Sequence, residues 1–178
     1  MKIALLLTGH LRTYMHHKVA LDHILFSQHD VDVYCGTWSV SQTRLNEELT
    51  AIDPNWWQLY RSNLKAAITV NIEDYTKTKP RLNIDAPIDD SRAREHFAAG
   101  WHERLYDQWF LVKETFKQIP EEALSQYDLV VRLRYDVGIK ELTLIPTEGI
   151  VIPADVGGWD CSDHLAYGAP SAMKNIAS

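Results

Sequence analysis

The chain has 178 residues, of which 46% are hydrophobic and 24% are charged, an ordinary composition for a single globular domain. Its 18 Lys and Arg residues are outnumbered by 24 Asp and Glu residues, and the formal net charge is -6. This balance argues against non-specific nucleic-acid binding, which needs a basic surface. It does not exclude an anionic small molecule, because a few arginines and a metal ion can neutralise phosphate locally.

The two cysteines, Cys35 and Cys161, lie too far apart in the sequence to form a metal-binding motif, and we expect both to be reduced. The apolar run after Lys2 has only about five residues, shorter than the core of a signal peptide. No apolar stretch is long enough to span a membrane. We therefore expect a cytoplasmic protein that forms one domain over residues 1–178.

The first third of the chain predicts a strand, a helix and a second strand. Residues 2–7 are continuously apolar, which is typical of a parallel strand buried on both faces. Residues 8–10 form a turn signal, and residues 12–26 carry the apolar spacing of a helix. Residues 30–37 are rich in β-branched residues and predict the second strand. The result is a βαβ unit with a right-handed crossover.

The middle of the chain contains its clearest helical pattern. Residues 41–65 are helical in pattern but interrupted by Pro54, and residues 66–72 predict a third strand. Residues 76–90 contain two prolines and little apolar periodicity, so we predict a loop. Residues 97–116 repeat apolar side chains at intervals of three and four, which predicts an amphipathic helix that ends before Pro120.

The last third predicts a fourth strand over residues 127–137 and a short strand over residues 150–152. Residues 157–158 are a glycine pair that predicts a turn, and a terminal helix is expected from Ser171. Alternating strands and helices predict an α/β fold with a mostly parallel central sheet flanked by helices. In such sheets ligands bind beyond the carboxyl ends of the strands.

The fourth strand carries an unusual group of charges. Alternate side chains of a strand share a face, so Arg132, Arg134 and Asp136 are expected to point the same way. Charged groups on an otherwise apolar strand need a partner or a ligand. One interpretation is a structural ion pair, Arg134 with Asp136 or with another acid such as Asp128. The other is that Asp136 holds a divalent cation while an arginine binds phosphate.

The turn after the first strand is a second candidate. Thr8 and Gly9 lead into the first helix, where a glycine allows a ligand to approach the backbone and helical N–H groups can meet an anion. Arg12 is a candidate phosphate contact. The turn is neither a GxGxxG nor a Walker A motif, and an ordinary strand-to-helix connection also explains it.

Tryptophan is abundant in this chain, with six residues. Trp38 directly follows the second strand and is predicted to meet a ligand. Trp101 and Trp109 lie on the apolar helix face and are predicted to be core residues. The pair of residues 56–57 fits either a core position or a platform for a sugar ring.

Near the end of the chain, Asp163 and His164 lie between two glycine-containing stretches. An acid here can be a metal ligand or a catalytic base, and the histidine a further ligand. A polar surface loop is the alternative. Six other histidines lack a metal-binding spacing and are predicted to lie on the surface: His16, His17, His23, His29, His96 and His102.

Three segments, MKIALLLTGHLRTY, YDLVVRLRYDV and DHLAYGAP, together resemble the GT-A-fold glycosyltransferases, including small members from phage and bacterial polysaccharide loci. The resemblance implies one Rossmann-like domain that binds a nucleotide-sugar, with UDP as the expected nucleotide, and a hydroxyl acceptor that can be a glycan. It also implies a divalent cation, Mn²⁺ or Mg²⁺.

The same resemblance assigns roles to residues. Asp136 matches the second acid of the metal-binding DxD motif, and Arg134 stands where its first acid would be. Asp163 matches a later acid that serves as catalytic base or supports the metal, with His164 beside it. The first loop and the arginines would contact the nucleotide. Two other functions remain open from the sequence: a nucleotide-sugar binding module with little or no transferase activity, and a metal-dependent nucleotidyltransferase.

Overall fold

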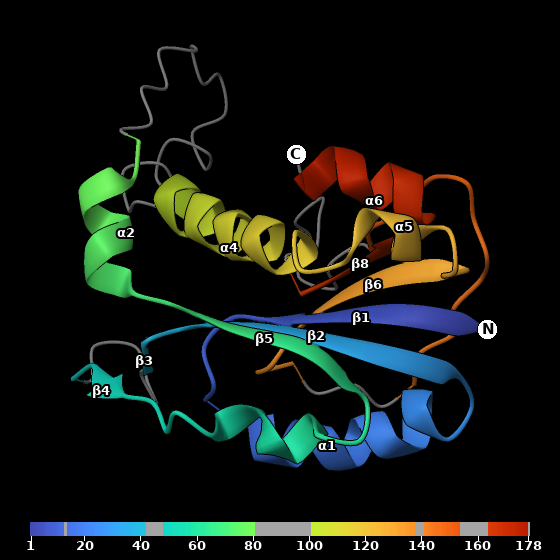
Figure 1. Cartoon of the computed structure of the whole chain (residues 1–178), viewed down its shortest axis with the longest axis horizontal. Coiled ribbons are helices and arrows are strands. Elements are labelled where there is room, and N and C mark those ends of the chain that lie inside the picture. The colour runs from blue at the N-terminus through green and yellow to red at the C-terminus, as the bar shows by residue number, and fades with distance from the viewer. Residues whose placement is uncertain (13, 42–47, 81–100, 138–140, 154–163, 178) are drawn as a thin grey trace.

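A computed structural model describes residues 1–12, 14–41, 48–80, 101–137, 141–153 and 164–177. A six-stranded sheet lies between two layers of helices (Figure 1). Its strands, in spatial order, are β5 (Leu64–Val70), β2 (Asp30–Trp38), β1 (Lys2–Thr8), β6 (Leu129–Arg134), β8 (Leu165–Gly168) and β7 (Ile150–Val151). The short strands β3 (Val40–Ser41) and β4 (Thr50–Ala51) pair with each other.

The helices cover both faces of this sheet. One layer holds α1 (Tyr14–Leu21), which continues as the π-helical turn η1 (Asp22–Phe26), and the 3₁₀ helix η2 (Trp56–Tyr60). The other layer holds α4 (Trp101–Phe116), α5 (Glu121–Leu124) and α6 (Pro170–Ala177) (Figure 1). The helix α2 (Ile72–Thr78) lies beside the first half of α4.

The expected α/β class with a mostly parallel sheet is confirmed. Strands β5, β2, β1 and β6 are all parallel, whereas β8 runs antiparallel to β6, and β7 antiparallel to β8. From β1 the chain builds outwards to β2 and β5, then returns to place β6 on the other side of β1. The sheet therefore has a topological switch point between β1 and β6, an arrangement compatible with a Rossmann-like fold.

Burial on both faces explains why β1 is continuously apolar. Its residues Ile3, Leu5 and Leu7 join a core cluster with side chains of α1, η1 and η2. Ala4 and Leu6 join the opposite cluster with side chains of α4, α5 and α6. All five are fully buried, so the absence of alternation in the sequence follows from a layer of helices on each side.

Two interpretations of the middle of the chain are wrong. The described part of residues 41–65 is not one interrupted helix: it holds strand β4, a turn at Asp53 to Asn55 and the single 3₁₀ helix η2. Residue 72, expected as the end of a strand, and residues 76–78, expected as loop, belong instead to α2. Its first turn is capped by Asn71, whose side chain accepts hydrogen bonds from the backbone N–H groups of Glu73 and Asp74. Residues 81–90 lie outside the described residues.

The strongly periodic elements are found close to where they were expected. Helix α4 occupies residues 101–116 of the predicted 97–116, of which 97–100 are not described, and α6 begins at Pro170. Strand β8 was not predicted, because four residues are too few for a periodic pattern. The expected glycine turn at residues 157–158 lies outside the described part of the chain. Among the described helices, none combines the length and apolar character needed to cross a membrane.

Helix α4 packs closely against the sheet at Gly36. A Cβ atom at this position would lie 1.9 Å from Oγ1 and 3.2 Å from Cβ of Thr115, which is fully buried. The Thr115 hydroxyl donates to the carbonyl oxygen of Leu111, 2.7 Å away, so it has no room to turn aside without losing that bond. Only glycine therefore fits beneath this turn of α4.

We expect Gly36→Ala to lower the free energy of unfolding by about 1–3 kcal/mol, the usual effect of overpacking a core. Urea unfolding measures it. Gly149→Ala is the matched control, because a Cβ there meets no atom within 4 Å. Adding Thr115→Ala to the Gly36 variant should recover part of the loss. Equal unfolding of the Gly36 and Gly149 variants would contradict the close approach.

Candidate functional site

The candidate site lies at the switch point of the sheet. The last residues of β1 and β6, Thr8 and Arg134, are direct neighbours in the parallel register. Because both strands run in the same direction, the loops that follow them leave from the same edge of the sheet. The sequence predicted contacts from the first loop and from the end of the fourth strand, and the structure brings these two segments together.

The first loop is held in place by backbone and side-chain hydrogen bonds to β2. Gly9 has a φ of +122°, a conformation that residues with a side chain rarely adopt. Its N–H donates to the carbonyl oxygen of Gly36 at 3.3 Å, and its carbonyl oxygen accepts from the Thr37 hydroxyl at 2.8 Å. Thr37 is fully buried, so this contact fixes the loop against the neighbouring strand. Sequence reasoning missed Thr37, because a threonine in a strand gives no signal of such a role.

Three charged side chains form the centre of the site. Arg134 donates to both carboxylate oxygens of Asp136, with 2.8 Å from Nε to Oδ1 and 2.7 Å from Nη2 to Oδ2. Arg12 approaches the same carboxylate, with Nη1 3.7 Å from Oδ2. The three side chains remain 14–25% exposed. The ion pair that the sequence offered as one interpretation of this strand is therefore present, and Arg12 extends it.

The charges of the arginines control the titration of Asp136. Burial alone would raise the pKa of this carboxyl group, but the hydrogen bonds and charge of Arg134, together with the charge of Arg12, outweigh that effect. The pKa of Asp136 is consequently held below its ordinary value. The carboxylate is thus negatively charged at neutral pH and neutralises one of the two arginines.

Two histidines lie near this cluster and were not predicted as site residues. His17 is only 7% exposed, so the expectation that it lies on the surface is wrong. It shares a helical face with Leu21 and Leu25, at intervals of four residues. This spacing is visible in the sequence and could have predicted that His17 is buried. Burial lowers the pKa of both imidazoles, and the charge of Arg12 lowers that of His10 further, although Asp136 acts in the opposite direction on each.

These lowered pKa values predict acid sensitivity. Unfolded imidazoles bind a proton below about pH 6.5, whereas the folded ones resist it, so at acidic pH the folded state binds fewer protons than the unfolded state. The free energy of unfolding should therefore decrease as the pH falls from about 7.5 to about 5.5 in urea titrations. His17→Leu should reduce this decrease, and the exposed His23→Leu should not. A decrease that is identical in all three proteins would contradict the assignment to His17.

Arg132 is buried beneath the first loop, on the face that α4 covers. Only 2% of it is exposed. Its Nε donates to the hydroxyl of Thr8 at 3.3 Å, its Nη2 lies 3.5 Å from Oε1 of Gln108, and its guanidinium carbon lies 5.6 Å from the centre of the Trp109 ring. Arg132 is thus a buried residue packed between the sheet and α4, whereas Arg134 is partly exposed in the charged cluster.

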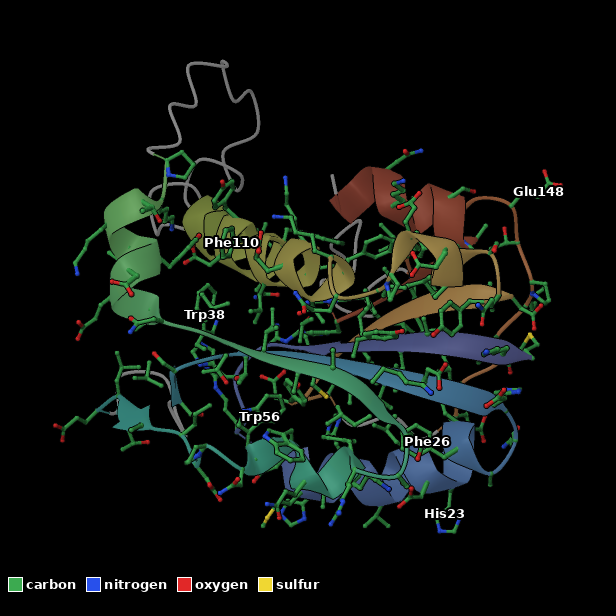
Figure 2. All side chains as sticks on the ribbon, viewed as in Figure 1. His23, Phe26, Trp38, Trp56, Phe110 and Glu148 are labelled. Carbon is green, nitrogen blue, oxygen red and sulfur yellow. The ribbon has the colours of Figure 1, made fainter. Side chains whose placement is uncertain are left out.

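Trp38 and Trp56 are both buried in the core. Trp38, predicted to meet a ligand, is 4% exposed and packs on Tyr75 and Phe110 at ring-centre distances of 4.9 and 6.3 Å. Figure 2 shows Phe110 of α4 next to Trp38, and Trp56 on the opposite side of the sheet. Trp56 is 2% exposed and belongs to the core cluster beneath α1, which settles its role as a core residue. The buried ring of Trp38 gives no support to ligand contact.

The segment after residue 163 reaches the site through its backbone. The carbonyl oxygen of His164 accepts a hydrogen bond from the N–H of Arg134 at 3.1 Å, directly before β8 pairs with β6. This places the start of the segment beside the charged cluster. Asp163 and Cys161 lie outside the described residues. Cys35 is buried in β2, and burial raises the pKa of its thiol to about 12, as expected of a reduced structural cysteine.

The described residues do not form a metal site in this arrangement. No group of three or more His, Cys, Asp or Glu side chains that can hold a cation occurs in the part of the chain that the structure describes. Both oxygens of Asp136 are bonded to Arg134, and a second guanidinium stands next to them. A cation at this carboxylate would face two positive charges at short range, so Asp136 as it stands does not fit the predicted metal ligand.

Comparison with known proteins identifies no family for this chain: no protein-family model matches it, and no curated protein is significantly similar to it in sequence.

Proposed function

We propose that this chain is a glycosyltransferase of the GT-A type that transfers a sugar from a nucleoside-diphosphate donor, a UDP-sugar, to a hydroxyl group of an acceptor such as a glycan. The observation that carries the proposal is the arginine cluster at the switch point between β1 and β6. Ligands of open α/β sheets bind at this place.

The charge of the site favours a diphosphate. The described cluster contains two arginines, Arg12 and Arg134, and one acid, Asp136, which leaves one positive charge in excess. The chain as a whole carries a net charge of -6, so this local excess is opposite in sign to the net charge of the protein. A positive site on an acidic protein selects an anionic ligand locally.

In the proposed reaction the bond between the anomeric carbon and the diphosphate oxygen breaks, and a bond from the acceptor oxygen to that carbon forms. The guanidinium groups of Arg12 and Arg134 would stabilise the negative charge that develops on the leaving diphosphate. The acceptor proton would pass to a carboxylate, for which Asp163 is the candidate, if the configuration at the sugar is inverted. No step is assigned to a divalent cation, because the described residues do not fit one at Asp136.

A thermal-shift panel tests the proposal. UDP-, GDP- and CMP-sugars are added to the protein in EDTA and in Mn²⁺, and UDP-sugars are expected to raise the melting temperature. A ligand at 100 times its dissociation constant stabilises a protein by about 2.7 kcal/mol, enough to detect. Release of UDP, followed with and without acceptors, then measures turnover. Absence of a shift with every nucleotide-sugar in both buffers would overturn the proposal.

The same measurements distinguish the other two functions. A nucleotide-sugar binding module would bind the donor but release no UDP with any acceptor. A nucleotidyltransferase would instead release pyrophosphate from a nucleoside triphosphate. Only UDP release that an acceptor accelerates supports a transferase.

A further inference from the structure

We propose that Asp136 is a positioning residue that orients Arg12 and Arg134 toward the diphosphate of the donor, and that it does not ligate a divalent cation. This inference rests on the proposed function and assigns the diphosphate contacts within it. It reverses the role that the sequence motif suggests, in which the acid binds a cation and the cation binds the diphosphate.

The Asp136 carboxylate is bound by Arg134 in a fixed geometry. Arg134 binds it through two parallel hydrogen bonds, 2.8 and 2.7 Å long, an arrangement that fixes the plane of the guanidinium as well as its position. The Cγ of Arg134 also passes 4.0 Å from the place that a Cβ of Gly9 would occupy, so the side chain lies close to the first loop. Both carboxylate oxygens of Asp136 therefore serve to orient Arg134.

Arg12 reaches the site from the loop after β1. Its Nη1 lies 3.7 Å from the carboxylate, and its buried Nε has no hydrogen-bond partner among the described residues. A buried guanidinium N–H without a partner is unfavourable, and a ligand oxygen would satisfy it. The Asp136 carboxylate therefore attracts the Arg12 guanidinium through Nη1 and leaves the Nε–H of Arg12 without a partner among the described residues.

The charges of the site add up to a positive value. Two guanidinium groups around one carboxylate leave a positive charge, and His10 and His17 add none at neutral pH because burial keeps their pKa values low. A divalent cation entering this group would meet net repulsion, whereas a diphosphate would meet net attraction. The same residues thus disfavour a cation and favour the anion.

The experiment measures UDP binding by calorimetry, with the complete chain at constant ionic strength, in EDTA and in Mn²⁺. The parent protein is expected to bind UDP in EDTA. Arg12→Ala and Arg134→Ala should each weaken that binding tenfold or more. Asp136→Asn should weaken it about tenfold, because the loss of the carboxylate that orients both arginines outweighs the gain from removing a negative charge. The matched controls are Arg61→Ala and Asp30→Asn, which should bind like the parent, because both residues are exposed and lie near the amino ends of β5 and β2, away from the site at the carboxyl ends.

The decisive readout is the gain in UDP affinity that Mn²⁺ produces. The proposal expects the same gain in the parent and in Asp136→Asn, whatever its size. A gain in the parent that the Asn variant loses would overturn the proposal, as would an Asn variant with unchanged affinity in EDTA. If neither protein binds UDP or another nucleotide of the panel in either buffer, the transferase proposal itself fails.

Arg134→Lys provides a second test that does not require Asp136→Asn to fold. Lysine keeps the positive charge but cannot make two parallel hydrogen bonds to the carboxylate. The proposal expects weaker UDP binding in EDTA and no larger gain from Mn²⁺. If Asp136 were a metal ligand, loosening its arginine would make it more available to the cation, and the gain from Mn²⁺ would increase.

Discussion

Replacing Arg132 with alanine is expected to lower the free energy of unfolding by about 2–4 kcal/mol, a large effect for one residue. The side chain is 2% exposed and fills the space between β1, β6 and α4. Its removal leaves a cavity beside Trp109 and takes away the hydrogen-bond donor for Thr8. Urea unfolding, with Arg61→Ala as an exposed control, measures the effect.

Arg132→Met separates the two contributions to that loss. Methionine refills much of the space but donates no hydrogen bond, so it should restore the part due to packing. The remaining difference from the parent then reports the polar contacts to Thr8 and Gln108. An alanine variant that unfolds like Arg61→Ala would show that Arg132 has no structural role.

Elements with a strong pattern were predictable from the sequence. The apolar run of β1, the β-branched run of β2 and the periodic face of α4 all reflect burial, and burial leaves a direct trace in the order of residues. Among the elements that were missed, α2 and β8 have seven and four residues. Elements this short depend on a cap such as Asn71 or on pairing with a distant strand, and a local window detects pairing poorly.

The candidate site was predictable in location but not in its internal contacts. That Thr8 and Arg134 end adjacent parallel strands follows from the α/β pattern and the rule for ligand sites in such sheets. The hydrogen bonds from Arg134 to Asp136 depend on side-chain geometry, which the sequence does not reveal. Trp38 shows the opposite case: its position after β2 suggested a ligand contact, but packing against Tyr75 and Phe110 buries it.

Strand β6 is buried, yet it ends with two arginines, Arg132 and Arg134, and each has partners that stabilise its charge. Strand β6 is apolar from Leu129 to Val131, and these residues pack into the core clusters on both faces of the sheet. Its charged residues follow beside the last residues of β1, where the first loop begins. Arg132 is stabilised by contacts with α4, and Arg134 by an acid two residues further along the chain. The strand thus changes from a core element to a candidate binding element near its carboxyl end.

Asp163→Asn is expected to lower turnover by roughly 100-fold or more while donor affinity is retained, the usual effect of removing a general base. The carboxylate itself lies outside the described residues, but His164, its neighbour, is bonded through its backbone to Arg134. The amide of asparagine is similar in size to the carboxylate and cannot accept the acceptor's proton. UDP release, with UDP binding measured in parallel, provides both quantities.

Two other results would assign Asp163 differently. If it supports a metal ion, affinity and turnover should fall together, and additional Mn²⁺ should partly restore both. If it serves only the local turn, the variant should match the parent in affinity, Mn²⁺ dependence and UDP release, and Asp163 would be removed from the site. Because hydrolysis of the donor also releases UDP, these outcomes can be separated before the acceptor is known, and the acceptor panel is needed only to measure the transfer itself.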